Sequence, residues 1–130
     1  MSKPLIGIVN DDTAFLDLMS DLLTEEGYDT FIGREGDKAY ALIKRRKPDL
    51  VILDIGMEHP EAGWLVLEML RLDPQLLHLP VILCSADTAA LRSKEQRLRD
   101  LHCGVLEKPF DLNELLAKVA EFLPPGASRA

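Results

Sequence analysis

The sequence predicts an α/β protein built on a doubly wound parallel sheet, and two features of its hydrophobic pattern indicate this class. Short apolar runs alternate with helical patterns along the whole chain. Four of these runs lead directly into polar residues: 6–9 into Asn10-Asp11-Asp12, 50–53 into Asp54, 81–84 into Ser85, and 105–107 into Lys108. Such runs are typical of parallel strands that are covered on both faces. Because parallel strands end along one edge, where ligands bind, we expect these polar residues to meet.

The first part of the chain predicts helices on either side of a second strand. After the first strand, apolar residues recur at helical spacing: Phe15, Leu18, Met19, Leu22 and Leu23. This helix is expected to end at Gly27, because glycine readily adopts the left-handed conformation that closes a helix. Residues 28–32 are expected to form the second strand. A weaker helix follows, and Pro48 stops it; its expected inward positions are Ala39, Leu42 and Ile43.

The second part of the chain continues the alternation. Residues 63–72 predict a helix, and residues 88–101 predict a polar helix with few inward apolar contacts. Asp111 and Glu114 are spaced as a capping box for the last helix, whose expected apolar face is Leu112, Leu115, Leu116, Val119 and Phe122. The result is a five-stranded sheet with five helices, joined by right-handed crossovers. Residues 1–123 are expected to be one domain, with 124–130 a flexible tail or the start of a linker.

Composition limits the classes of function. The 130 residues suffice for one domain with a real core, and 47% of them are hydrophobic. The formal charge of 15 − 22 = −7 argues against binding nucleic acid through the overall field. No apolar stretch approaches the ~20 residues of a membrane span, so we expect a cytoplasmic protein that binds no membrane. Cys84 and Cys103 are expected to be reduced core residues.

The polar residues at the strand ends have the chemistry that phosphoryl transfer requires. Three carboxylates, from Asp11, Asp12 and Asp54, need protons or a cation when they converge, and ligands that are all oxygen favour Mg²⁺. The ammonium of Lys108 and the hydroxyl of Ser85 suit the oxygens of a phosphoryl group. A central carboxylate can accept that group as an acyl phosphate. The sequence therefore predicts a Mg²⁺-dependent aspartate phosphorylation site.

Residues 4–123 resemble the receiver domains of bacterial response regulators, in particular single-domain chemotaxis regulators. The motifs that carry the resemblance are Asn10-Asp11-Asp12, Asp54, Ser85-Ala86 and Lys108-Pro109-Phe110. The resemblance implies a flavodoxin-like fold with strand order 2-1-3-4-5. It also implies a signalling module of two-component systems and phosphorelays, which is no enzyme beyond promoting its own phosphorylation and dephosphorylation.

The resemblance also implies a role for each site residue and for the partners. Asp54 would accept the phosphoryl group from a sensor histidine kinase or a phosphotransfer protein, and Ser85 and Lys108 would bind phosphoryl oxygens. The implied Mg²⁺ ligands are Asp11, Asp12, Asp54 and the backbone carbonyl of Gly56. Phosphorylation would switch a face for a downstream protein target or effector domain, formed by residues 88–101, the last strand and the last helix. No direct contact with nucleic acid is implied, and dimerisation on phosphorylation stays open.

Two features depart from the family pattern. The loop over residues 57–63 is one residue longer than usual, and Val105 stands where many receivers have an aromatic ring that turns inward on activation. Valine has no ring to turn. These departures support an alternative, a pseudo-receiver that binds partners without switching. A phosphatase of the aspartate-nucleophile type is disfavoured, because Gly56 stands where such enzymes place a second acid.

Several of these residues also have simpler interpretations. Asp11 and Asp12 could serve only to cap the first helix. The basic run over 44–47 ends a predicted helix, where cations offset the helix dipole, and this is favoured over nucleic-acid binding. Trp64 follows a glycine at the start of a helix and is expected to be a packing residue.

Overall fold

The computed structural model describes residues 3–55, 62–85, 89, 103–108 and 110–123. Its strands are β1 (Leu5–Val9), β2 (Asp29–Gly33), β3 (Leu50–Asp54), β4 (Val81–Ser85) and β5 (Cys103–Glu107). They pair in parallel in the order β2-β1-β3-β4-β5. The predicted α/β class and the strand order implied by the resemblance are both confirmed. The second strand begins one residue later than predicted, and Tyr28 is buried just before it.

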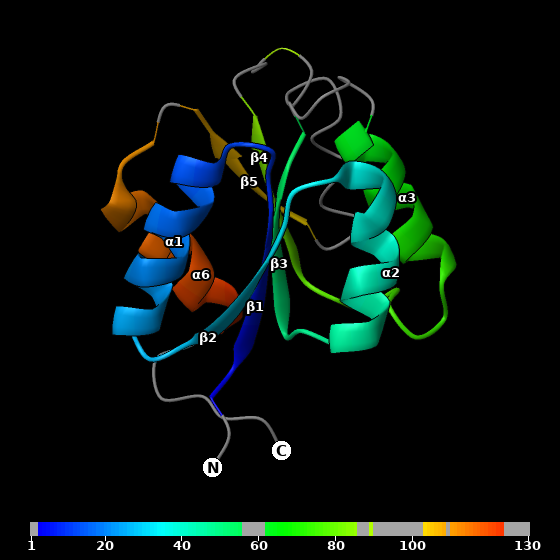
Figure 1. Cartoon of the computed structure of the whole chain (residues 1–130), viewed down its shortest axis with the longest axis horizontal. Coiled ribbons are helices and arrows are strands. Elements are labelled where there is room, and N and C mark those ends of the chain that lie inside the picture. The colour runs from blue at the N-terminus through cyan, green and yellow to red at the C-terminus, as the bar shows by residue number, and fades with distance from the viewer. Residues whose placement is uncertain (1–2, 56–61, 86–88, 90–102, 109, 124–130) are drawn as a thin grey trace.

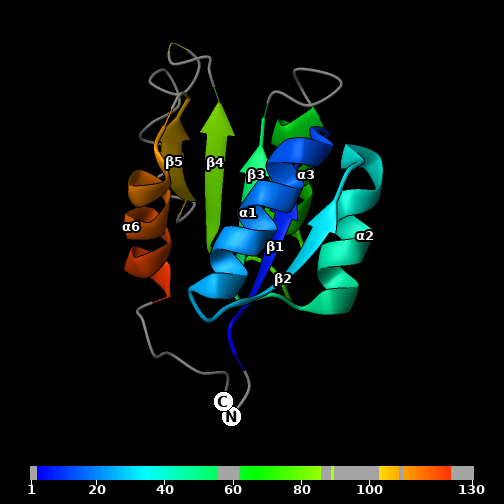
Figure 2. The same cartoon turned by 60° about the vertical axis from the view of Figure 1, so that its left-hand side comes forward.

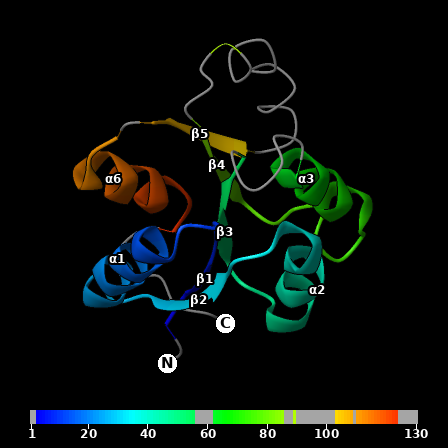
Figure 3. The same cartoon turned by 45° about the horizontal axis from the view of Figure 1, so that its top comes forward.

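The described helices are α1 (Thr13–Glu25), α2 (Gly36–Arg46), α3 (Ala62–Leu72) and α6 (Leu112–Phe122). Figure 3 shows α1 and α6 on one face of the sheet and α2 and α3 on the other. Apart from residue 89, the helix expected over 88–101 lies outside the described residues, as do residues 56–61 and 124–130. None of the described helices is long and apolar enough to cross a membrane.

Each face of the sheet is covered by its own hydrophobic cluster. Val51 and Leu53 of β3 belong to the cluster under α2 and α3, whereas Ile52 between them belongs to the cluster under α1 and α6. This alternation follows from the strand geometry, in which successive side chains point to opposite faces. All five residues of β1, β3 and β4 are buried, as the unbroken apolar runs predict.

The register places the polar ends of the strands at one level. Val9 pairs with Leu53, Asp54 with Cys84, and Ser85 with Glu107. Figures 1 and 2 show the sheet from two sides, and in Figure 2 the arrowheads of β3, β4 and β5 point the same way. The residues that follow these strands therefore share one edge of the sheet.

The helix ends confirm most of the predicted signals. Asp111 caps α6 by accepting a hydrogen bond from the Glu114 N–H at 2.7 Å. Gly27 has a φ of 96°, which is the left-handed conformation expected after α1. The basic residues 44–46 occupy the last turn of α2. Lys47 then ends this helix with a φ of 51°, which the sequence did not indicate.

Two residues assigned to the apolar helix faces were predicted wrongly. Leu18 is 52% exposed and Leu112 is 40% exposed, so neither lies in the core. In α1, Met19 and Leu23 are buried as predicted, and Leu16, which was not predicted, is buried with them. The i, i+3, i+4 spacing fits more than one stripe in a leucine-rich helix, and packing on the sheet decides which stripe is buried.

A buried aspartate joins α2 to the residues after α3. Asp73 accepts hydrogen bonds from the Tyr40 hydroxyl and, at 2.9 Å, from the Gln75 N–H, and its carboxylate lies 2.8 Å from Lys44 Nζ. These contacts to Lys44, Tyr40 and Gln75 lower the pKa of Asp73 from 3.8 to about 2. The charged form of Asp73 is therefore favoured in the folded protein.

This pKa shift predicts how stability responds to acid. Because the folded pKa lies below the unfolded value, the contribution of Asp73 is complete above pH 3.8 and is lost as pH falls towards about 2. We expect Asp73→Asn to lower the Tm at neutral pH and to flatten the Tm profile between these two values. Thermal unfolding across that range, with Asp17→Asn on the exposed side of α1 as control, measures this. Equal profiles for Asp73→Asn and wild type would contradict it.

Candidate functional site

The predicted site residues follow four neighbouring strands. Asp54 is the last residue of β3 and Ser85 is the last residue of β4, and both are buried. Lys108 comes directly after β5. Asp11 and Asp12 come after β1 and are exposed. Gly56 lies outside the described residues.

Asp54 and Lys108 form the central contact of the site. The Lys108 Nζ lies 3.0 Å from Asp54 Oδ2, and the side chains are 30% and 6% exposed respectively. A carboxylate buried to this extent needs a charged or hydrogen-bonding partner, which the ammonium supplies. The backbone aligns the lysine, because the Lys108 N–H donates to the Ser85 carbonyl at 2.8 Å. Three predicted residues from β3, β4 and β5 are thus brought together.

The turn after β1 is organised by Asn10, which the sequence analysis did not treat as a site residue. Asn10 is only 2% exposed, and its Oδ1 accepts a hydrogen bond from the Asp12 N–H at 2.9 Å. Asp12 in turn caps α1, because its Oδ1 accepts from the Phe15 N–H at 3.2 Å. An asparagine that bonds the backbone two residues later is a known turn former, and this signal could have identified Asn10. The capping role of Asp12 is confirmed, and it leaves the second carboxylate oxygen for other contacts.

An aromatic pair borders Lys108. The Lys108 Nζ lies 5.7 Å from the centre of the Phe15 ring, within the range of a cation–π contact. The Phe110 ring meets the Phe15 ring edge to face, with centroids 6.3 Å apart. The sequence placed Phe15 only in the apolar stripe of α1. Lys108 therefore contacts both the Asp54 carboxylate and an aromatic ring.

Gly63 allows α3 to approach the end of β3 closely. A β-carbon at Gly63 would lie 2.6 Å from Ile55 Cα and 2.8 Å from the Asp54 carbonyl oxygen. Both distances are shorter than side-chain carbons tolerate, so only glycine fits without a backbone shift. Trp64 is partly buried against the same core cluster, which confirms its expected packing role.

The two cysteines and Val105 are core residues on the strands that lead to Ser85 and Lys108. Burial raises the pKa of Cys84 to about 12, so this thiol is neutral beside Asp54. Cys84 and Cys103 are both free, as expected. Val105 is partly buried and packs against the cluster under α2 and α3. The position where a ring would be needed for the usual switch is therefore occupied by a packed aliphatic side chain.

Carboxylate oxygens, such as those of Asp11, Asp12 and Asp54, are suitable ligands for Mg²⁺. The described residues, however, do not form a preassembled metal-binding cluster. Within residues 3–55, 62–85, 89, 103–108 and 110–123, no three acidic, histidine or cysteine side chains are grouped so that they could hold a metal ion. Asp54 is paired with Lys108, and Asp11 and Asp12 face solvent. The expected convergence of three carboxylates around Mg²⁺ stays a prediction.

Comparison with known proteins places the chain in a family. Residues 6–120 match the model of the response regulator receiver domain. The chain therefore belongs to the response regulator receiver domain family, whose members act in two-component signalling. Such domains are generally signalling modules and not enzymes.

Two curated relatives and one solved structure illustrate the match. The chain is 35% identical over 120 residues to RpaA of Synechocystis sp., described as a DNA-binding dual master transcriptional regulator. The aligned region covers 92% of this chain but only 49% of RpaA. The chain is also 32% identical over 118 residues to the polar-differentiation response regulator DivK of Brucella anthropi. That alignment covers 89% of this chain and 93% of DivK. The chain thus spans about half of RpaA and nearly all of DivK.

The structural neighbour supports the fold alone. The chemotaxis protein CheY4 of Vibrio cholerae aligns with a TM-score of 0.81 at 23% identity, over 94% of this chain and 100% of CheY4. This agreement confirms the flavodoxin-like fold with strand order 2-1-3-4-5.

Proposed function

We propose that Asp54 accepts a phosphoryl group from a histidine kinase or a phosphotransfer protein, in a reaction that requires Mg²⁺. The observation that carries the proposal is the buried pair of Asp54 and Lys108 at 3.0 Å, beside Ser85. A buried carboxylate with a lysine and a hydroxyl at the ends of adjacent strands has the parts that a phosphoryl acceptor needs.

The transfer follows from the chemistry of these groups. An Asp54 carboxylate oxygen attacks the phosphorus of a phosphohistidine, a P–O bond forms, and the P–N bond to the imidazole breaks. The imidazole nitrogen leaves with the electron pair and takes a proton. The new acyl phosphate carries extra negative charge at the position where Lys108 already lies, and the Ser85 hydroxyl can donate to a phosphoryl oxygen.

Receiver domains bind Mg²⁺ at their active site, and this supports a metal requirement here. The proposed ligands are Asp11, Asp12, Asp54 and the Gly56 carbonyl. The ion would offset the negative charge of the carboxylates and of the incoming phosphoryl group. Asp12 is held in place by its bonds to Asn10 and α1, so one ligand is positioned before the ion binds.

Intact-mass spectrometry with a small phosphodonor tests the proposal. We expect wild type incubated with Mg²⁺ and acetyl phosphate to gain the mass of one phosphoryl group, and to gain none when EDTA replaces Mg²⁺. The acyl phosphate should be lost on treatment with hydroxylamine, which cleaves acyl phosphates. A modification that survives hydroxylamine, or that forms equally in EDTA, would refute the proposal.

Mg²⁺ is also expected to stabilise the folded domain. A ligand that binds only the folded state at about 100 times its Kd adds about 2.7 kcal/mol to the free energy of unfolding. We expect thermal unfolding to show an upward Tm shift with Mg²⁺, and Asp12→Asn to lose most of it. Asparagine is as good a helix cap as aspartate, so this variant isolates the charge. An equal Mg²⁺ shift in wild type and Asp12→Asn would exclude Asp12 as a ligand.

After phosphorylation, a downstream partner is proposed to bind the surface that includes β5, α6 and residues 88–101. A hydroxyl that gains a charge-assisted bond only in the phosphorylated state can draw the end of β4 inward. Ser85 pairs with Glu107 in the sheet, and its carbonyl holds Lys108, so a shift of β4 reaches β5 directly. The occupant of this face is proposed to be a target protein or an effector domain.

A second candidate is a pseudo-receiver that binds partners without switching, and the packed Val105 favours it. No ring is present at this position to turn inward on activation. Beryllofluoride, which mimics the acyl phosphate, separates the two candidates by hydrogen exchange. Changed exchange in β5 and α6 supports switching, and unchanged exchange there supports the pseudo-receiver.

A further inference from the structure

The outer edge of β2 carries backbone groups that face away from the sheet. Among the described strands, β2 pairs with β1 alone. The N–H of Asp29 and the carbonyl of Gly33 both bond to the β1 side, at 2.9 Å and 3.0 Å. Because alternate residues of a strand direct their backbone groups to opposite edges, Thr30 and Ile32 direct theirs outward. An edge of this kind is a template for an additional strand.

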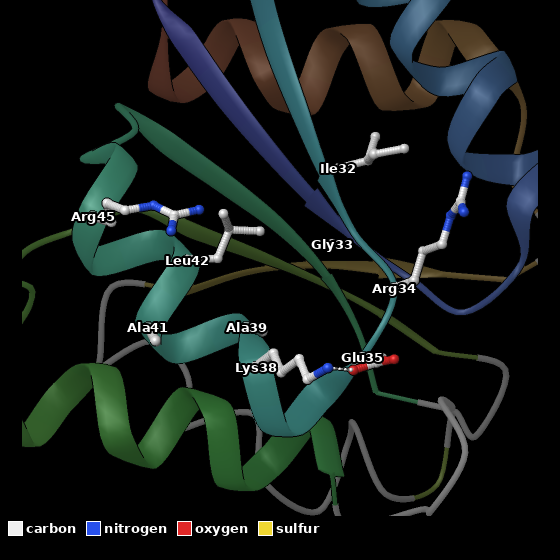
Figure 4. A pocket seen from close by; sticks show the side chains of 9 residues that line it. All are labelled: Ile32, Gly33, Arg34, Glu35, Lys38, Ala39, Ala41, Leu42 and Arg45. Atoms are coloured by element: carbon white, nitrogen blue, oxygen red, sulfur yellow. Dashed lines mark ion pairs between the residues drawn. The ribbon is translucent and has the colours of Figure 1, made fainter.

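A pocket of about 680 Å³ lies over this edge and has walls on both sides of it. Figure 4 shows Ile32 and Arg34 on the side of the sheet that faces α1, with Leu42 and Arg45 rising from α2 on the other side. Ile32 and Leu42 are half-buried, so each wall has an apolar part next to an exposed arginine. An extended segment laid along the edge would direct alternate side chains to the two walls.

The pocket is positively charged in a protein whose formal charge is −7. Its lining holds three cations, Arg34, Lys38 and Arg45, against the single anion Glu35. Lys38 lies 2.9 Å from Glu35, which offsets both charges. In the described part of the chain, Arg34 and Arg45 form no ion pair. A cationic edge on an acidic domain attracts acidic partners, and it repels the same edge of a second copy, which carries the same cations.

We propose that the β2 edge binds an extended acidic segment of a partner protein, which adds to the sheet as a sixth strand. Backbone hydrogen bonds to Thr30 and Ile32 would supply affinity. Specificity would come from acidic and aliphatic side chains on each face of the added strand, because each wall offers one arginine and one aliphatic contact. The site is distinct from the phosphorylation site and does not depend on Asp54.

Fluorescence anisotropy with a defined probe tests this inference. The probe is a labelled, end-capped peptide about eight residues long in which two glutamates and two valines repeat, so that each face of the strand presents both residue types. We expect Arg45→Glu to weaken binding by at least about tenfold, since the residue lies on a wall of the pocket. The matched control is Lys118→Glu on α6, which makes the same change in charge on the opposite face of the sheet. It should bind the peptide as wild type does.

Two further measurements test the mode of binding. Bound peptide should slow hydrogen exchange at the amides of Thr30 and Ile32, which face the edge. A peptide N-methylated at every residue, which lacks backbone donors along both edges, should not bind. Arg45 is exposed, whereas Lys118 is 28% exposed and lies 3.5 Å from Glu121, so circular dichroism and the Tm of both variants check that they fold.

Five results would overturn the proposal. Equal weakening by Lys118→Glu would mean that the overall field attracts the peptide. Undiminished binding of the N-methylated peptide, or unchanged exchange at Thr30 and Ile32, would exclude strand addition. Displacement of the peptide by equimolar inorganic phosphate would indicate a small-anion site. A dimer in sedimentation that Arg45→Glu abolishes would make the edge an interface between copies of this chain.

Discussion

Replacing Asp54 by asparagine is expected to abolish phosphorylation by acetyl phosphate and Mg²⁺ completely. The amide has no nucleophilic carboxylate oxygen, and no other described carboxylate is buried at the carboxyl ends of the strands. The fold should persist, because asparagine matches aspartate in size and can still contact Lys108. Intact-mass spectrometry of the variant and of wild type, under identical conditions, measures the loss.

The control for this experiment is Asp111→Asn. This aspartate lies near Lys108 in sequence and caps α6, and asparagine caps a helix as well as aspartate does. We expect Asp111→Asn to be phosphorylated like wild type. If Asp54→Asn still gains a phosphoryl group, or if the group maps to Ser85 or a histidine, Asp54 is not the acceptor.

Substitution of Gly63 is expected to have the largest effect on stability. A β-carbon there would meet Ile55 Cα at 2.6 Å and the Asp54 carbonyl at 2.8 Å, and both are backbone atoms that cannot rotate away. Alanine gains about 1 kcal/mol in helix propensity over glycine, but overpacking typically costs about 1–3 kcal/mol. We expect Gly63→Val, which gains less propensity and adds more bulk, to lower the free energy of unfolding by about 3 kcal/mol.

Denaturant unfolding of Gly63→Val and of Gly33→Ala measures this effect. At Gly33 a β-carbon would lie 3.4 Å from Leu42 Cδ2 and 3.7 Å from Val9 Cγ2, which are ordinary contacts. Gly33→Ala should therefore be tolerated. We also expect Gly63→Val to slow phosphorylation of the fraction that folds, because the displaced carbonyl belongs to Asp54. Wild-type stability in Gly63→Val would show that α3 can move away from β3 at no cost.

Much of this protein follows from local sequence. Unbroken apolar runs predicted β1, β3 and β4, because strands that are buried on both faces are mostly apolar along their length. Asp111 and Gly27 predicted helix ends, since capping depends on a few adjacent residues. The placement of Asp54, Ser85 and Lys108 along one edge followed from the same pattern, because parallel strands align their carboxyl ends.

Other features depended on contacts between distant segments, and only the tertiary structure decided them. The buried stripe of α1 includes Leu16 and excludes Leu18, because packing on the sheet selects among overlapping helical spacings. Gly63 is required by its approach to β3, and Phe15 borders Lys108, although neither pair is close in sequence. The cationic pocket arises where α2 folds beside the edge of the sheet. Sequence patterns record burial and local geometry, whereas these features depend on which elements become neighbours after folding.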